Sequence, residues 1–140
     1  MRIGVFDSGL GGIATLKDLI KYKPNNEYIY FGDTINLPYG EKTKEELKEY
    51  ADKIINFLKE KEVDMIIIAC GTISSNIYEE IKDSYGIPIY DIINPICNYL
   101  ENKCHDVLLL ATSMTIRSKV FKSKLEEKNI KVYDKECPMF

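Results

Sequence analysis

Residues 65–72 have the sequence MIIIACGT, an uninterrupted apolar run that leads into a cysteine. A run of this length is typical of a strand that is buried on both faces of a parallel sheet, and a helical pattern begins at Thr72. Cys70 is therefore expected at the carboxyl end of a strand, where open α/β sheets bind ligands, and beside a helix N-terminus, which favours a thiolate. The competing interpretation is a small buried thiol that only packs. The neighbouring motifs decide between the two.

Outward from this segment, apolar runs of strand length alternate with stretches of helical period. Strands are expected at residues 2–6, 27–32, 64–69, 87–90, 106–111 and 130–133, and helices at 11–22, 43–61, 74–84, 92–103 and 113–128. This alternation predicts an α/β fold in which helices cover both faces of a parallel sheet. Asn94-Pro95 is expected to end a first lobe, residues 1–95, and residues 96–140 to begin a second, similar one. Because no helical pattern follows the strand at 130–133, we expect an interrupted chain.

The segment 43–61 gives the clearest helix signal. Thr43 followed by Glu46 is the pattern of a capping box, in which each side chain bonds the backbone of the other. Apolar residues then recur at three- and four-residue steps on one face, namely Leu47, Tyr50, Ala51, Ile54, Ile55 and Leu58. Such spacing predicts an amphipathic helix packed on the sheet.

Composition and charge limit the classes of function. The chain has 140 residues, 45% of them hydrophobic, which suits one compact domain or part of a larger protein. With 19 basic and 22 acidic residues and no long run of either sign, we expect no nucleic-acid partner and no membrane contact. Asp7 interrupts the first apolar run before a signal-peptide core forms, so a cytoplasmic protein is expected. The 4 cysteines form no C-x-x-C pair, which predicts reduced thiols and no metal site.

The first strand leads into a glycine-rich turn, residues 7–14, with the sequence DSGLGGIA. Its G-x-G-x-x-A spacing, with Asp33 at the end of the next strand, is compatible with a dinucleotide site. Asp7 would then repel a pyrophosphate at close range, so a small zwitterion fits better. Ser8 would bond its carboxylate, and Asp7 would hold its ammonium group or accept a proton from a thiol. Asp7 as a plain helix N-cap is the structural alternative.

Three more strand ends carry small polar groups. Pro38, Tyr39 and Gly40 form a loop that either closes over a ligand or is an ordinary turn. Hydroxyls also follow the strands that end near residues 70 and 111, where they would cradle a carboxylate together with free backbone N–H groups or simply cap helices; they belong to Thr72, Ser74, Thr112 and Thr115. Because these ends meet at one edge of the sheet, we expect a single crevice.

Together these motifs resemble the glutamate racemase family, within the aspartate/glutamate racemase superfamily. The matching segments are residues 3–12, 30–34, 37–40, 68–72 and 111–115, followed by Ser118 and residues 137–140. They occur in the family's order and spacing, and they extend across the whole chain.

The resemblance implies a cofactor-independent reaction in which two cysteines exchange the α-proton of glutamate from opposite faces and supply D-glutamate for peptidoglycan. Cys70 would be the acid or base on one face, and Asp7 would assist its proton transfers. The remaining matched positions would hold the substrate; they are Ser8, Pro38, Tyr39, Gly40, Gly71, Thr72, Thr112 and Thr115. No cofactor and no metal are implied, and a homodimer is left open.

Two departures from the family limit this expectation. Asparagine is usual where this chain has Gly71, and loss of its hydrogen bonds would cost roughly 1–3 kcal/mol, which leaves the choice between glutamate and aspartate open. The second catalytic cysteine lies, in the family, beyond Phe140, so the chain alone is expected to be inactive or half-competent. Other amino-acid racemase-like proteins, a non-catalytic small-anion-binding module and a dinucleotide-binding module are the alternatives.

Overall fold

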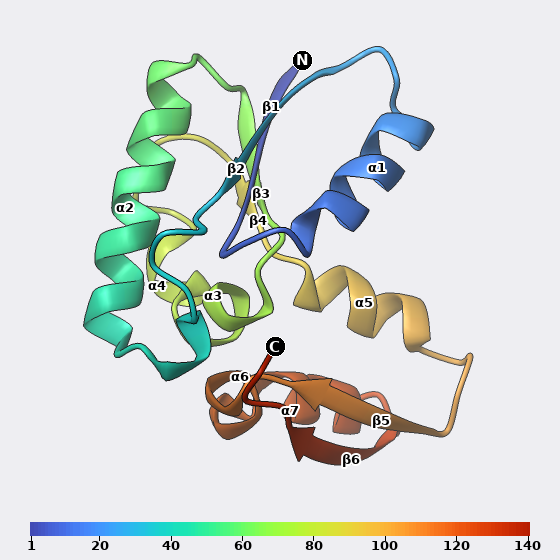
Figure 1. Cartoon of the computed structure of the whole chain (residues 1–140). Coiled ribbons are helices and arrows are strands. Elements are labelled where there is room, and N and C mark those ends of the chain that lie inside the picture. Colours follow the sequence, from blue (N-terminus) through green and yellow to red (C-terminus); the bar gives the residue numbers. More distant parts are fainter.

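A computed structural model describes residues 1–140 and shows an α/β chain with two parallel sheets (Figure 1). The larger sheet has the strand order β2-β1-β3-β4 and the smaller one pairs β5 with β6. The strands are β1 (Arg2–Asp7), β2 (Glu27–Gly32), β3 (Met65–Ile68), β4 (Ile89–Tyr90), β5 (Asp106–Ala111) and β6 (Lys131–Glu136). The predicted fold class is confirmed.

Helices connect the strands, as the parallel pairing requires. They are α1 (Gly12–Tyr22), α2 (Lys44–Glu60), α3 (Gly71–Asn76), α4 (Tyr78–Ile81), α5 (Ile93–Leu100), α6 (Ser113–Ser118), α7 (Val120–Glu126) and the 3₁₀ turn η1 (Tyr39–Glu41). None of them is long and apolar enough to cross a membrane.

Helices α1 and α2 lie on opposite faces of the larger sheet (Figure 1). Alternation along β1 explains this arrangement, because Val5 joins the apolar cluster below α1 and Phe6 joins the cluster below α2. Leu58 of α2 is fully buried, and a β-carbon on Gly4 would lie only 3.1 Å from its Cδ1 atom. The central strand is thus covered on both sides.

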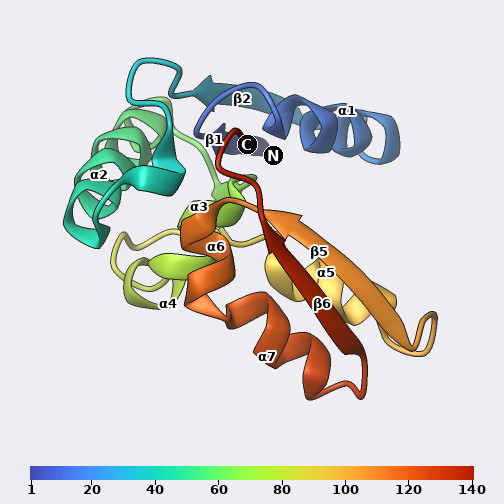
Figure 2. The ribbon, with the colours of Figure 1, turned by 60° about the horizontal axis from the view of Figure 1, so that its bottom comes forward.

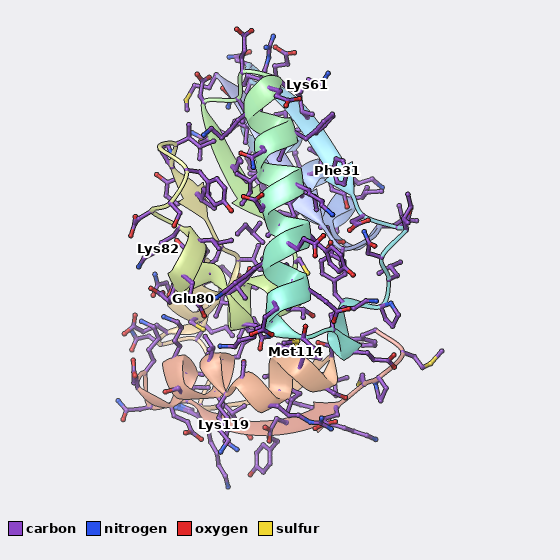
Figure 3. All side chains as sticks on the ribbon, turned by 90° about the vertical axis from the view of Figure 1, so that its left-hand side faces the viewer. Phe31, Lys61, Glu80, Lys82, Met114 and Lys119 are labelled. Carbon is purple, nitrogen blue, oxygen red and sulfur yellow. The ribbon has the colours of Figure 1, made fainter.

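The expected capping box starts α2. The Thr43 hydroxyl accepts a hydrogen bond from the Glu46 amide at 3.2 Å, and the Glu46 carboxylate accepts one from the Thr43 amide at 2.8 Å. In the first turns of α2, Lys44 and Lys48 pair with Glu80 of α4, and Figure 3 shows Glu80 beside α2. These contacts fix the end of α2 that lies nearest to the smaller sheet.

The smaller sheet is packed on one face only. Cys97 of α5 and Phe121 and Leu125 of α7 form an apolar cluster against Ile130 and Val132. The opposite face of the sheet is open (Figure 2) and exposes apolar side chains, namely Leu108 (66%), Leu110 (45%) and Tyr133 (49%). An open apolar groove of about 460 Å³ also lies beside α1 on the larger sheet.

Several expected boundaries were wrong; for example, the helix expected at 92–103 ends at Leu100. The helix expected at 74–84 begins at Gly71 and is divided at Ile77, whose φ of −131° is not helical. The helix expected at 113–128 is divided at Lys119, which adopts a left-handed φ of 58° (Figure 3). The last strand continues past residue 133 to Glu136, because its backbone pairs with β5 as far as Ala111. Each of the two helices is divided by the backbone conformation of a single residue, which apolar periodicity does not reveal.

Candidate functional site

The carboxyl ends of β1, β3 and β5 bring the predicted site residues together. Asp7 ends β1, and the Ala69 amide just beyond β3 bonds the Phe6 carbonyl at 2.8 Å, so Cys70 follows beside Asp7. From the smaller sheet, Met114 of α6 packs against the apolar cluster that contains Cys70. Met114 marks this junction below α2 in Figure 3. These contacts bring residues that follow strands of both sheets together.

Cys70 is buried, with 3% of its surface exposed. Burial is the largest influence and raises the pKa of the thiol, and the nearby charge of Asp7 raises this pKa further. Hydrogen bonding from the Ile73 amide and from Ser8 lowers the same pKa. The pocket thus favours a thiol at rest and still contains donors that would stabilise a thiolate.

The Asp7 carboxylate lies beside the first residue of α1 and near the Cys70 thiol. Its Oδ2 atom accepts hydrogen bonds from the amides of Gly9 at 3.3 Å and Gly12 at 2.9 Å, at the beginning of α1. Its Oδ1 atom has only the Ser8 hydroxyl, at 3.5 Å. One Asp7 oxygen therefore holds the turn and the other has a single long hydrogen bond, whereas the N-cap residue of α1 is Gly11 rather than Asp7.

The glycine-rich turn is built for this carboxylate. A β-carbon on Gly12 would lie 2.7 Å from the Asp7 Cβ and 2.9 Å from the Ala69 Cβ, so only glycine fits there. The amides of Gly9 and Gly12 already donate to Asp7. Since a dinucleotide site uses such amides for its pyrophosphate, this arrangement argues against the dinucleotide alternative.

The loop from Pro38 to Gly40 lies beside these strand ends, and the Tyr39 ring is buried in the apolar cluster that contains Cys70. Tyr39 is 2% exposed, and its hydroxyl donates a 2.6 Å hydrogen bond to the Asp33 carboxylate. Burial and this bond raise the pKa of Tyr39. A β-carbon on Gly40 would lie 2.8 Å from the Thr112 Cβ. The Gly40 backbone therefore lies directly against the Thr112 side chain.

Three threonine hydroxyls meet where α3 and α6 begin. The Oγ1 atom of Thr112 lies 3.0 Å from that of Thr72 and 2.9 Å from that of Thr115. The Thr115 hydroxyl also lies 3.4 Å from the Thr72 hydroxyl. Thr112 caps α6 by accepting from the Thr115 amide at 3.3 Å. Thr112 thus caps a helix and also takes part in the cluster of three hydroxyls.

Comparison with known proteins places this geometry in a family. The model of the Asp/Glu/Hydantoin racemase family matches residues 14–138. The chain belongs to this family. It is 40% identical to a glutamate racemase of Thermoanaerobacter pseudethanolicus over 99% of this chain and 53% of that protein. It is 37% identical to the glutamate racemase of Aquifex aeolicus, of which it covers 56%.

Solved racemase structures agree. The chain superposes on a glutamate racemase from Aquifex pyrophilus with a TM-score of 0.93 and 34% identity, over 100% of this chain and 56% of that one. For a Francisella tularensis glutamate racemase in complex with D-glutamate, the TM-score is 0.88 at 37% identity, over 99% and 54%. The chain thus spans about half the length of the racemases it matches.

Two residues beside these strand-end side chains were not predicted as part of the candidate site. Asp33, considered only as a ribose-binding acid, holds Tyr39. The Tyr30 hydroxyl donates to the Gly9 carbonyl at 2.8 Å, and burial and the charges of Asp7 and Cys70 raise the pKa of Tyr30 to about 12. Asp33 lies at the end of a strand, as Asp7 does, and this position could have indicated that Asp33 belongs to the site. Tyr30 lies within β2, where nothing in the pattern distinguishes it from a packing residue.

The other cysteines lie elsewhere in this racemase chain. Cys97 is buried in the apolar cluster of the smaller sheet, and Cys104 lies near the Leu100 carbonyl, with the sulfur 3.8 Å away. Cys137 follows β6, and its sulfur lies 3.8 Å from the Lys135 carbonyl.

Proposed function

We propose that this chain forms one acid–base face of a glutamate racemase site, with Cys70 as the group that exchanges the α-proton. The observation that carries the proposal is the Cys70 thiol, buried at a strand end between Asp7 and the amide of Ile73. A packing cysteine needs no carboxylate beside it with an oxygen that has only one long hydrogen bond. Asp7 would accept and return protons at Cys70, and it would attract the substrate's ammonium group.

The substrate proposed is glutamate, because the relatives at about 40% identity are named glutamate racemases. Aspartate racemase structures resemble the chain at 21% identity, which supports the fold alone. The substrate carboxylates would be held by the residues named from the motifs, namely Ser8, Pro38, Tyr39, Gly40, Gly71, Thr72, Thr112 and Thr115. The three meeting hydroxyls and the backbone at Gly40 support this assignment.

Substrate binding would itself activate the thiol. In the structure burial raises the pKa of Cys70, so the thiol is a weak base. A bound ammonium group would favour the thiolate, because an opposite charge within a few ångströms lowers a thiol pKa. The thiolate then takes the α-proton, the electron pair stays on the α-carbon and its carboxylate, and the thiol returns a proton to the same face.

Inversion requires a second proton donor on the opposite face. Cys97 and Cys104 lie away from the crevice, and the Cys137 sulfur turns toward a backbone carbonyl. We therefore propose that the 140-residue chain exchanges the α-proton of one enantiomer without inverting it. We also propose that the first lobe ends at residue 95, that the protein is cytoplasmic and that it serves peptidoglycan synthesis. Sedimentation would test whether it forms a homodimer.

Alkylation of the cysteines by iodoacetamide, read by peptide mass spectrometry, tests whether glutamate occupies this site. We expect glutamate to slow the alkylation of Cys70 in a saturable manner and to leave Cys137, the internal control, unchanged. If Cys70 reacts at the same rate at every glutamate concentration, the proposed site is wrong. Protection of Cys70 in a chain that exchanges no α-proton would favour the small-anion-binding module instead.

A further inference from the structure

We propose that Asp33 is a positioning residue of the site, which holds the Tyr39 phenol and so fixes the Tyr39–Gly40 backbone against Thr112. This inference rests on the proposed function, because the Tyr39–Gly40 backbone would contact the substrate. Asp33 itself would not contact it and would act only through Tyr39.

The Asp33 carboxylate is buried and fully engaged by neutral donors. Its Oδ2 atom accepts the 2.6 Å bond from the Tyr39 hydroxyl. The Asn36 side-chain amide donates to Oδ2 at 2.8 Å and to Oδ1 at 3.0 Å. Hydrogen bonds to a charged acceptor are short and stronger than neutral ones. The loop between β2 and η1 is thus folded around one carboxylate.

From this carboxylate, contacts lead to both sheets. The Asp33 amide donates to the Asp7 carbonyl at 3.0 Å, which attaches the loop to the end of β1. The Tyr39 ring lies in the same apolar cluster as Cys70. Gly40 approaches Thr112 so closely that a β-carbon on Gly40 would overlap the threonine side chain. A shift of the phenol would therefore displace the backbone that faces Thr112.

The chain provides a matched control pair of the same chemistry. The Tyr85 hydroxyl donates a 3.0 Å hydrogen bond to the Asp52 carboxylate, and burial followed by this bond raises the pKa of Tyr85 to about 12. Asp52 lies on α2 and does not border the crevice. This bond is exposed, whereas the bond between Tyr39 and Asp33 is buried, so its removal should cost less stability and should leave Gly40 in place.

The experiment compares Asp33→Asn, Tyr39→Phe and their double variant with Asp52→Asn and Tyr85→Phe. The glutamate concentration that halves Cys70 alkylation gives a dissociation constant for each. We expect Asp33→Asn and Tyr39→Phe each to weaken glutamate binding about tenfold, as loss of one charge-assisted bond suggests. The double variant should be no weaker than either single one, because both substitutions remove the same bond. The control variants should stay within about twofold of the parent.

The amide resonances of Gly40 and Thr112 provide a readout that needs no ligand. They should shift in Asp33→Asn and Tyr39→Phe and stay in place in the control variants. Unchanged dissociation constants together with unshifted resonances would overturn the proposal. If glutamate fails to protect even the parent chain, the proposed function is wrong, and the resonances alone decide the role of Asp33. Should Asp33→Asn not fold, Tyr39→Phe, which removes a single oxygen atom, carries the test.

Discussion

The groups around Cys70 have opposing effects on the pKa of its thiol. Burial and the charge of Asp7 raise its pKa, and the donors at Ile73 and Ser8 oppose them. The net direction is upward, so the folded state favours the thiol. The thiolate that the proposed chemistry needs forms only at high pH or beside a bound cation.

The alkylation rate of Cys70 without substrate should therefore rise with pH to a midpoint above that of a model thiol, which lies near about 8.5. Folding stability should fall over the same range, because the unfolded chain ionises first. Cys70→Ala should reduce that loss, and the remainder would come from Cys97, whose pKa is also raised by burial. Stopped-flow alkylation and urea unfolding between pH 7 and 10 measure both. A midpoint at or below that of glutathione would contradict this account.

Gly71 is the second informative residue, because a β-carbon there would meet no atom within 4 Å. Gly71→Asn should fold normally and bind glutamate more tightly, by about tenfold if the amide makes one good hydrogen bond to the substrate. The Cys70 protection assay measures this change. Gly12→Ala, whose β-carbon would overlap Asp7, should destabilise the fold and serves as the contrast. Equal or weaker glutamate binding by Gly71→Asn would exclude an open subsite at this position.

At the scale of elements, the capping box of α2 is a local device that should act independently of the site. Thr43→Ala should lower the free energy of unfolding by about 1 kcal/mol, because it leaves the Glu46 amide without its acceptor. Urea denaturation measures the change. Lys53→Ala, on the exposed side of the same helix, is the control and should leave the midpoint unchanged. A loss of glutamate protection in Thr43→Ala would show that α2 is coupled to the crevice.

The sequence predicted those elements that repeat a pattern. Apolar runs located the strands, and Thr43 with Glu46 located the start of α2 to the residue. The division at Lys119 was not predictable, because it depends on one left-handed backbone angle in an otherwise continuous helical pattern. Within the site, polar residues at strand ends were found by position. The orientation of the Tyr39 ring was not predicted, because it depends on a hydrogen bond to Asp33 in the preceding loop.

On the scale of the whole molecule, the two apolar surfaces of the smaller sheet differ in kind. The covered surface packs against Leu125 of α7, which is 2% exposed, whereas Leu108 and Leu110 on the other surface are exposed to solvent. Leu125→Ala should lower the free energy of unfolding by about 2–4 kcal/mol. The double variant Leu108→Gln and Leu110→Gln should change it by less than about 0.5 kcal/mol and should bind less of a fluorescent apolar dye. Unfolding of the double variant would show that the open face is part of the core.

The most direct test of the central claim follows the α-hydrogen of each glutamate enantiomer in heavy water by proton NMR, with optical rotation recorded in parallel. We expect the chain to exchange the α-hydrogen of one enantiomer for deuterium without change in rotation, and we expect Cys70→Ala to abolish this exchange. Exchange that persists in Cys70→Ala, or its absence with both enantiomers in the parent chain, would contradict the assignment of Cys70 as the acid–base group.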